Sequence, residues 1–298
     1  MRHAGSRTPA LIALAVTTLA WAGIYIVGGV LVDSIDPISL TLLRWGPAAV
    51  VLLILAQLIE RPDWRRVARD GWKLLLLGCL GMIGFSTLLL EGLRHTTPVS
   101  GSLIGSAGPV LIAVLSAVVL RSRLGWRMIA GLVISIVGVA LVVTKGALGS
   151  ILSVGVNLGD LLIVLATLCW AVYTVLGRIL SKVPVITSTA VQAAFATILL
   201  AIVVSFTGLQ LPHDAGSWVG AAYLSLIGSA LGFFLWNWAL RTVPPPVAGL
   251  TMNLIPLWTV LLALALGEGI HLWEALGGVV IIAGVLLGTL PARRRAVA

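Results

Sequence analysis

Two short stripes of small and polar residues, each ending at a proline, are the first positions where this chain could bind a small solute. The first stripe, spaced i, i+4 and i+7, consists of Ser102, Ser106 and Pro109. The second stripe has the same spacing and consists of Gly249, Asn253 and Pro256. This spacing puts each stripe on one helix face, and a proline within an apolar helix frees a backbone carbonyl that needs a partner. Close packing of helices explains the small residues but not Asn253. We therefore expect both stripes to line a path, with Pro109 and Pro256 as hinges.

Aromatic residues mark two further helices. One stripe consists of Trp21, Tyr25 and Gly28, and its counterpart consists of Trp170, Thr174 and Gly177, with Tyr173 one position away. Bulky rings can close a cavity and glycine allows backbones to approach, so we expect a gate with Gly28 and Gly177 as hinges. The alternative is a belt of aromatic residues at the lipid interface. Trp236 and Asn237 are also candidates for the path, although core packing would explain them equally well.

One charged residue lies well inside an apolar run. Arg44 follows the start of its run by about seven residues, or roughly 10 Å of helix. An unpaired cation at that depth is costly, so we expect an ion pair with Glu91, with Asp33 and Asp36 as alternative partners. The arginine could act as a structural clamp or attract a substrate carboxylate.

Several kinds of chemistry lack their sequence signatures. The chain has no glycine-rich phosphate loop and no serine in a GxSxG turn, and its four histidines have no spaced His, Cys or acidic partners. We therefore expect no metal, no cofactor and no enzymatic activity.

The composition indicates a membrane protein. The chain is 59% hydrophobic, only 10% charged, and has a mean hydropathy of +1.13. Apolar runs of about twenty residues, enough to cross a bilayer as helices, follow one another with short polar breaks. The ten runs are 9–32, 37–59, 72–93, 97–120, 125–144, 158–180, 185–207, 217–240, 245–266 and 271–290. Because no segment alternates like a barrel strand, we expect an all-α integral membrane protein with ten transmembrane helices.

The basic charge follows the topology. If the N-terminus is cytoplasmic, sixteen Lys and Arg residues lie in the inner segments and two in the outer ones. This bias predicts an inner-membrane protein with both termini in the cytoplasm. The net charge of +9 is therefore a topology signal, and we expect no nucleic-acid partner.

The chain also repeats itself. Residues 77–141 align without a gap to residues 224–288, and the alignment pairs Pro109 with Pro256 and Trp126 with Trp273. The aromatic stripes align at a shift of 149 residues. We expect a first five-helix repeat at 1–146, a linker at 147–157 and a second repeat at 158–298. Because five is an odd number, the second repeat enters the membrane from the opposite side, which is a transporter architecture.

The repeated segments resemble a known family. Residues 253–268 with the following Trp273 and Gly277–Val285, and residues 108–139 in the first half, are similar to the repeat of EamA-type transporters in the drug/metabolite transporter superfamily. Residues 91–100 resemble exporters of the YddG type, which carry aromatic and other amino acids. One departure is Arg121, because the repeat usually carries an acidic residue there, as Glu268 does in the second half.

The resemblance and the charge-poor path together imply an exporter of amino acids, with aromatic or other apolar ones favoured, that works by alternating access. The expected partners are a small-molecule substrate and the lipid bilayer, and we expect a monomer or weak oligomer. Another small metabolite or a lipophilic drug is the alternative substrate. An intramembrane enzyme or a channel subunit would be a different class.

Overall fold

In a computed structural model, the described residues are 7–95, 104–105, 107–144, 158–180, 182–265 and 272–290. Regular structure in these ranges is helical throughout, with no strand. The helices not divided by a π-helical turn are α1 (Arg7–Leu31), α3 (Trp64–Arg69), α7 (Gly108–Val119), α8 (Trp126–Thr144), α9 (Leu158–Leu180), α10 (Val185–Thr207), α13 (Pro245–Thr251), α14 (Leu254–Ala265) and α15 (Leu272–Thr289).

Three longer rods contain π-helical turns. The helix α2 (Pro37–Leu55) continues as η1 (Ala56–Glu60). The second rod is α4 (Gly71–Gly78), η2 (Cys79–Gly84) and α5 (Phe85–His95), and the third is α11 (Ala215–Ala222), η4 (Tyr223–Leu231) and α12 (Gly232–Ala239). A π turn widens the helix and disturbs its regular hydrogen bonding, and such turns are frequent at functional sites.

Many of these rods are suited to a bilayer. Within the described residues, six helices of 23–25 residues are long and apolar enough to cross a membrane, and three shorter apolar helices accompany them. Large apolar side chains such as Val30, Val50 and Phe206 are exposed on the outside of the bundle. A surface so apolar would be unusual for a soluble protein. The expectation of an all-α membrane protein therefore agrees with the structure.

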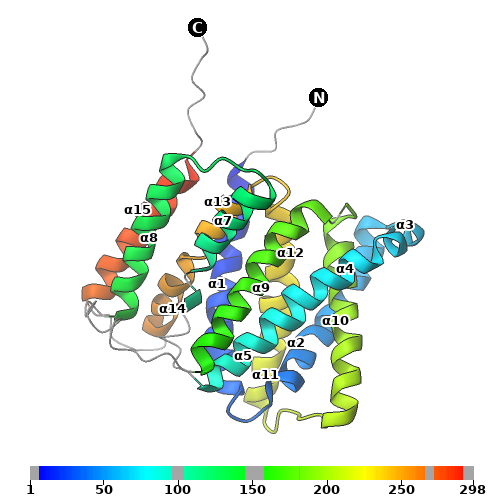
Figure 1. Cartoon of the computed structure of the whole chain (residues 1–298). Helices are drawn as coiled ribbons and strands as arrows, with labels where there is room; N and C mark the ends of the chain where they lie inside the picture. The colour runs from blue at the N-terminus through cyan, green and yellow to red at the C-terminus, as the bar shows by residue number, and fades with distance from the viewer. Residues whose placement is uncertain are drawn as a thin grey trace.

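The helices pack as pairs drawn from the two halves of the sequence. Pairs with extensive contacts include α8 with α15, α2 with α10, α5 with α9, α1 with α12, and α7 with α13. Figure 1 shows α8 and α15 side by side at one edge of the bundle. A Cβ atom added at Gly131 of α8 would lie 2.6 Å from the Gly284 carbonyl oxygen of α15. Glycine is therefore required for these two backbones to approach so closely.

The two ends of the bundle serve as reference points. In Figure 1, α1 begins and α15 ends at the same end of the molecule, which we call the terminal end. We call the opposite end, where α2 begins, the far end. At the far end, Asp36 caps α2 by accepting hydrogen bonds from the backbone N–H groups of Ile38 and Ser39 at 3.0 and 2.9 Å. Pro37 opens the helix in the first turn, where its missing N–H costs nothing.

Candidate functional site

Six aromatic rings from α1, α5, α9 and α12 meet in the middle of the bundle. This aromatic cluster consists of Trp21, Phe85, Trp170, Tyr173, Phe233 and Trp236. Trp170 is central, with ring centroids 4.9 Å from Trp21, 5.1 Å from Phe85 and 5.3 Å from Trp236. The rings therefore pack directly against one another.

Polar groups on the rings hold the aromatic cluster in place. The indole N–H of Trp21 donates to the Gly228 carbonyl of η4 at 3.0 Å, and that of Trp170 donates to Met252 Sδ at 3.2 Å. A Cβ atom added at Gly232 would lie 2.6 Å from Trp21 Nε1, so only glycine permits this contact. The indole N–H of Trp236 has no hydrogen-bond partner within the part of the chain that the structure describes.

A cavity of about 320 Å³ adjoins the aromatic cluster. Its lining residues come from α9, α10 and α12 with the turn after it, and they are Tyr173, Gly177, Arg178, Val185, Ser188, Gln192, Asn237, Leu240 and Arg241. Tyr173 belongs to both the aromatic cluster and the cavity wall, so the rings lie at the inner limit of the cavity. Arg178 and Arg241 are exposed near the ends of α9 and α12, so the cavity opens towards the terminal end.

The inner wall of the cavity is polar. Asn237 donates from Nδ2 to the Tyr173 hydroxyl at 2.8 Å and to Thr189 Oγ1 at 3.2 Å. Gln192, only 2% exposed, donates from Nε2 to Ser188 Oγ at 2.9 Å. Its Oε1 atom has no protein partner among the described residues. A buried carbonyl without a partner is costly, so this atom can accept a hydrogen bond from a solute in the cavity.

The mouth of the cavity is positive. Arg178 donates to the Val243 carbonyl at 3.4 Å, and Arg241 donates to the Val183 carbonyl at 2.9 Å. Partial burial lowers the pKa of Arg241 from its usual value, while the Glu60 carboxylate acts in the opposite direction. Because arginine starts from a very high pKa, its guanidinium stays charged at neutral pH. The two arginines therefore attract anionic groups to the mouth, and the Glu60 carboxylate offsets part of their charge.

The described residues of the polar stripes, Pro109, Gly249, Asn253 and Pro256, do not line the cavity. Asn253 is fully buried and donates from Nδ2 to Ser135 Oγ of α8 at 2.6 Å, and Gly249 packs against Ile112. Asn253 does not line the cavity described above, but its Oδ1 atom has no hydrogen-bond partner in the described ranges. Ser102 and Ser106 lie outside the described residues. The place of these stripes along a path stays a prediction.

The predicted hinges occupy different positions in their helices. Pro256 lies in the first turn of α14, directly after the break at Met252–Asn253 that separates α13 from α14. Pro109 lies in the first turn of α7. Gly28 and Gly177 lie inside the unbroken helices α1 and α9. Bending at these four positions stays a prediction.

Arg44 is buried next to the aromatic cluster. Its side chain is 0% exposed, and Nε donates to Ser229 Oγ of η4 at 2.6 Å. Its guanidinium carbon lies 5.4 Å from the centre of the Trp45 ring, and Tyr25 is near enough to interact with its charge. Tyr25 itself is partly buried on α1, one turn after Trp21. Thr174 is fully buried on α9, and its hydroxyl has no partner among the described residues.

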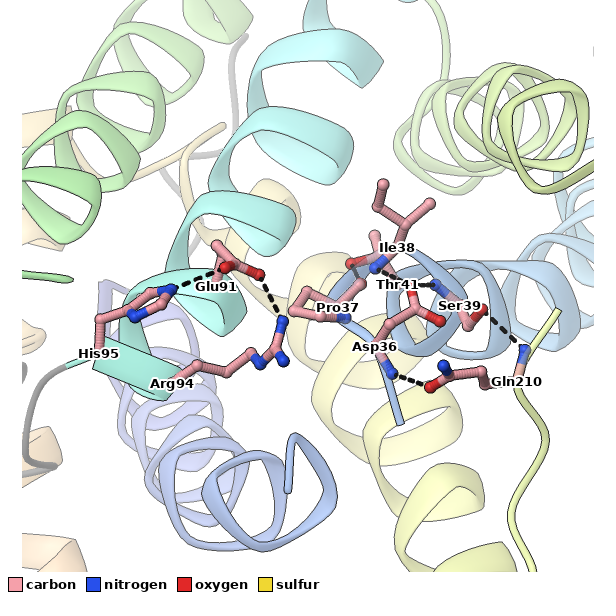
Figure 2. A network of polar contacts seen from close by, with 9 residues as sticks. All are labelled: Asp36, Pro37, Ile38, Ser39, Thr41, Glu91, Arg94, His95 and Gln210. Atoms are coloured by element: carbon pink, nitrogen blue, oxygen red, sulfur yellow. Dashed lines mark hydrogen bonds and ion pairs between the residues drawn. The ribbon is translucent and has the colours of Figure 1, made fainter. Parts of the chain in front are cut away.

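The predicted ion pair between Arg44 and Glu91 is not formed. Figure 2 shows Glu91 turned towards its own helix, where it contacts Arg94 Nη1 at 3.3 Å and His95 Nε2 at 2.9 Å. Residues three and four positions later on a helix are always close, so these local partners replace the distant one. The alternative partner Asp36 caps α2 instead, and its backbone N–H donates to Gln210 Oε1 at 2.7 Å.

The cavity brings some predicted residues together and adds others. Tyr173, Gly177 and Asn237 lie in its wall, and Trp21, Trp170 and Trp236 lie in the aromatic cluster. The sequence interpretation missed Phe85, Ser188, Gln192, Phe233, Arg178 and Arg241 as members of the site. Gln192 carried a signal, because an amide in the middle of an apolar run needs a buried partner. The two arginines were read only as markers of topology.

Comparisons with known proteins agree with this architecture. The family model described as the EamA-like transporter family matches residues 8–144 and again residues 157–290. The uncharacterized transporter YyaM of Bacillus subtilis is 31% identical over 256 residues, which is 84% of each chain. A probable terminal-alkyne amino-acid exporter of Streptantibioticus cattleyicolor is 29% identical over 291 residues, or 95% of each chain. A solved crystal structure with 20% identity has the same fold, with a TM-score of 0.79 over 98% of this chain and 100% of the other.

The two family matches cover nearly all of the described helices, including those that form the aromatic cluster and the cavity. A transporter needs a solute cavity inside a bundle of apolar helices, and the described residues contain both. The chain is a multi-pass membrane protein that belongs to the EamA-like transporter family.

Proposed function

We propose that the protein exports amino acids, with aromatic or other apolar ones favoured, across the inner membrane by alternating access. The observation that carries this proposal is the polar cavity that ends at the aromatic cluster, because a transporter caught open to one side has this arrangement. The cavity supplies amide and hydroxyl groups for a zwitterion, and the aromatic rings supply a surface for an apolar side chain.

The charge at the cavity mouth supports a substrate with a carboxylate. Arg178 and Arg241 attract anions and disfavour lipophilic cations, which include many drugs. The similarity to a probable amino-acid exporter points in the same direction.

Two inverted five-helix repeats, at 1–146 and 158–298 with a linker at 147–157, would provide the two states. The family model matches residues 8–144 and residues 157–290, and three of the helix pairs, α2 with α10, α7 with α13 and α8 with α15, join corresponding helices of the two halves. If the repeats exchange conformations, the opening moves from the terminal end to the far end at nearly equal energy. With both termini cytoplasmic, the cavity of this structure faces the cytoplasm.

Flux measurements test the proposal. The purified protein is reconstituted in liposomes, and flux of radiolabelled amino acids is followed with and without a pH gradient. We expect flux of phenylalanine and leucine above that of protein-free liposomes. If liposomes with and without the protein show equal amino-acid flux, and the protein transports a lipophilic cation such as tetraphenylphosphonium, the protein is a drug exporter and the amino-acid proposal fails.

A further inference from the structure

The guanidinium of Arg44 is only partly satisfied. Its Nε atom donates to Ser229, but Nη1 and Nη2 have no hydrogen-bond partner in the part of the chain that the structure describes. The side chain is 0% exposed. An uncompensated buried charge is strongly destabilising, and such a residue inside a membrane helix indicates function. A structural clamp would use those two nitrogen atoms.

The surroundings of Arg44 hold the guanidinium in a fixed direction. Ser229 accepts from Nε and donates its own hydroxyl to the Leu224 carbonyl at 2.8 Å, within the π-helical segment η4. The Trp45 ring lies on one side, 5.4 Å away. The edge that carries Nη1 and Nη2 is therefore left for a ligand. Two parallel N–H groups of a guanidinium match the two oxygen atoms of a carboxylate.

The position of Arg44 places it between the far end and the aromatic cluster. It follows the first residue of α2 by seven positions, which is roughly 10 Å of helix from the far end. Its neighbour Trp45 packs edge-on against Phe233 of the aromatic cluster at 4.7 Å. The cavity of this structure approaches the same rings from the terminal end.

The repeat relates Arg44 to the open cavity. At the shift of 149 residues, Arg44 corresponds to Ala193, the neighbour of Gln192. Gln192 follows the first residue of α10 by seven positions and lines the cavity with an unsatisfied oxygen. In this structure the terminal end is open around α10. If the repeats exchange conformations, the far end would open around α2 in the same way.

We infer that Arg44 binds the carboxylate of the substrate when the protein opens towards the far end. The inference deepens the proposed function and depends on it for the transport step. The ligand class is a small monocarboxylate with an apolar body, because the guanidinium lies beside aromatic rings and offers one fork of N–H donors.

Ligand binding tests this role without requiring transport. The full-length protein is purified in detergent, and its melting temperature is measured with 3-phenylpropionate, L-phenylalanine or phenethylamine. We expect 3-phenylpropionate to stabilise the wild type, and Arg44→Gln to weaken its apparent affinity on the order of ten- to a hundredfold, as for loss of a charged hydrogen bond. Arg44→Lys should restore part of the affinity, because lysine keeps the positive charge but lacks the paired N–H donors of a guanidinium. Arg65→Gln, the same change on the exposed face of α3, should bind like the wild type.

The stability of the ligand-free protein shows whether Arg44 binds a ligand or only stabilises the fold. We expect Arg44→Gln to melt at or above the wild-type temperature, since it removes an uncompensated charge. A lower melting temperature together with unchanged 3-phenylpropionate binding would overturn the inference, as would a wild type that no carboxylate stabilises. If liposomes show no amino-acid flux but carboxylate binding still requires Arg44, the proposed function fails and the inference stands.

Discussion

At the residue scale, the unsatisfied polar atoms mark the places where the protein can still form a bond. Within the described residues, they include Gln192 Oε1 at the cavity, the Trp236 indole N–H in the aromatic cluster, and the Arg44 guanidinium. Buried polar groups in folded proteins are almost always paired, so a group of unpaired atoms along one route is informative. These three groups, with four unpaired atoms, follow the route from the terminal end towards the far end.

Replacement of Gln192 tests the cavity end of that route. We expect Gln192→Leu to lower the apparent affinity for phenylalanine, offered from the terminal side, about two- to tenfold, the range for one neutral hydrogen bond. Its melting temperature should not fall, because Leu fills a similar volume and removes an unpaired oxygen. Dose–response curves of flux in liposomes measure the effect. Gln57→Leu, on the exposed surface of η1, is the matched control, and equal affinities in both variants would exclude Gln192 from the substrate contact.

At the element scale, helix contacts depend on small residues where backbones meet. In the pair α8 and α15, backbone meets backbone at Gly131 and Gly284. We expect Gly131→Ala to lower stability by about 1–3 kcal/mol, because its Cβ atom would meet backbone rather than a movable side chain. Thermal unfolding in detergent measures the effect. Gly29→Ala, where nothing lies within 4 Å, should be neutral or stabilising, and a similar loss in both variants would contradict this explanation.

At the far end, a polar contact joins α2 to the segment after α10. Asp36 donates from its backbone to Gln210 Oε1, and the Gln210 backbone N–H donates to Ser39 Oγ at 3.0 Å (Figure 2). Ser39 corresponds to Ser188 of the open cavity at the shift of 149 residues. The same position therefore lines the cavity at one end and joins the contact with Gln210 at the other.

Removal of this contact should favour opening at the far end. We expect Gln210→Ala to raise the labelling rate of a cysteine introduced by Leu90→Cys about two- to tenfold, since one side-chain hydrogen bond is lost. Leu90 is 0% exposed on α5 near the far end and corresponds to Asn237 of the cavity. The measurement uses a membrane-impermeant maleimide after replacement of Cys79 and Cys169 by serine. An unchanged rate would show that the contact with Gln210 does not hold the far end closed.

The sequence predicted helix positions better than it predicted helix contacts. The expected run 185–207 coincides with α10, because apolar length and polar breaks mark the ends of a membrane helix. The break at Met252–Asn253 and the π turns of η2 and η4 were not foreseen, since no composition signal marks them. The pair of Arg44 with Glu91 was wrong because sequence gives the depth of a residue but not the direction in which its helix face points.

At the scale of the whole molecule, the aromatic cluster lies where the two halves meet. Trp21 comes from the first half, and its closest ring contact, Trp170 at 4.9 Å, comes from the same position of the second half. Pairs such as α2 with α10 and α8 with α15 join corresponding helices in the same way. If the halves are inverted repeats, this seam has two equivalent ways to open, and the rings at its centre would separate the two openings.

The orientation of the halves is the last point to test. If they are inverted repeats of five helices, residue 150 and the C-terminus lie on opposite sides of the membrane, and the C-terminus is cytoplasmic. We expect an impermeant maleimide added to intact spheroplasts to label Ser150→Cys and not Ala298→Cys, with Cys79 and Cys169 replaced by serine. Labelling of Ala298→Cys after the membrane is opened is the control for reactivity. Labelling of both positions in intact spheroplasts would place them on one side, and two parallel halves cannot exchange an inward opening for an outward one.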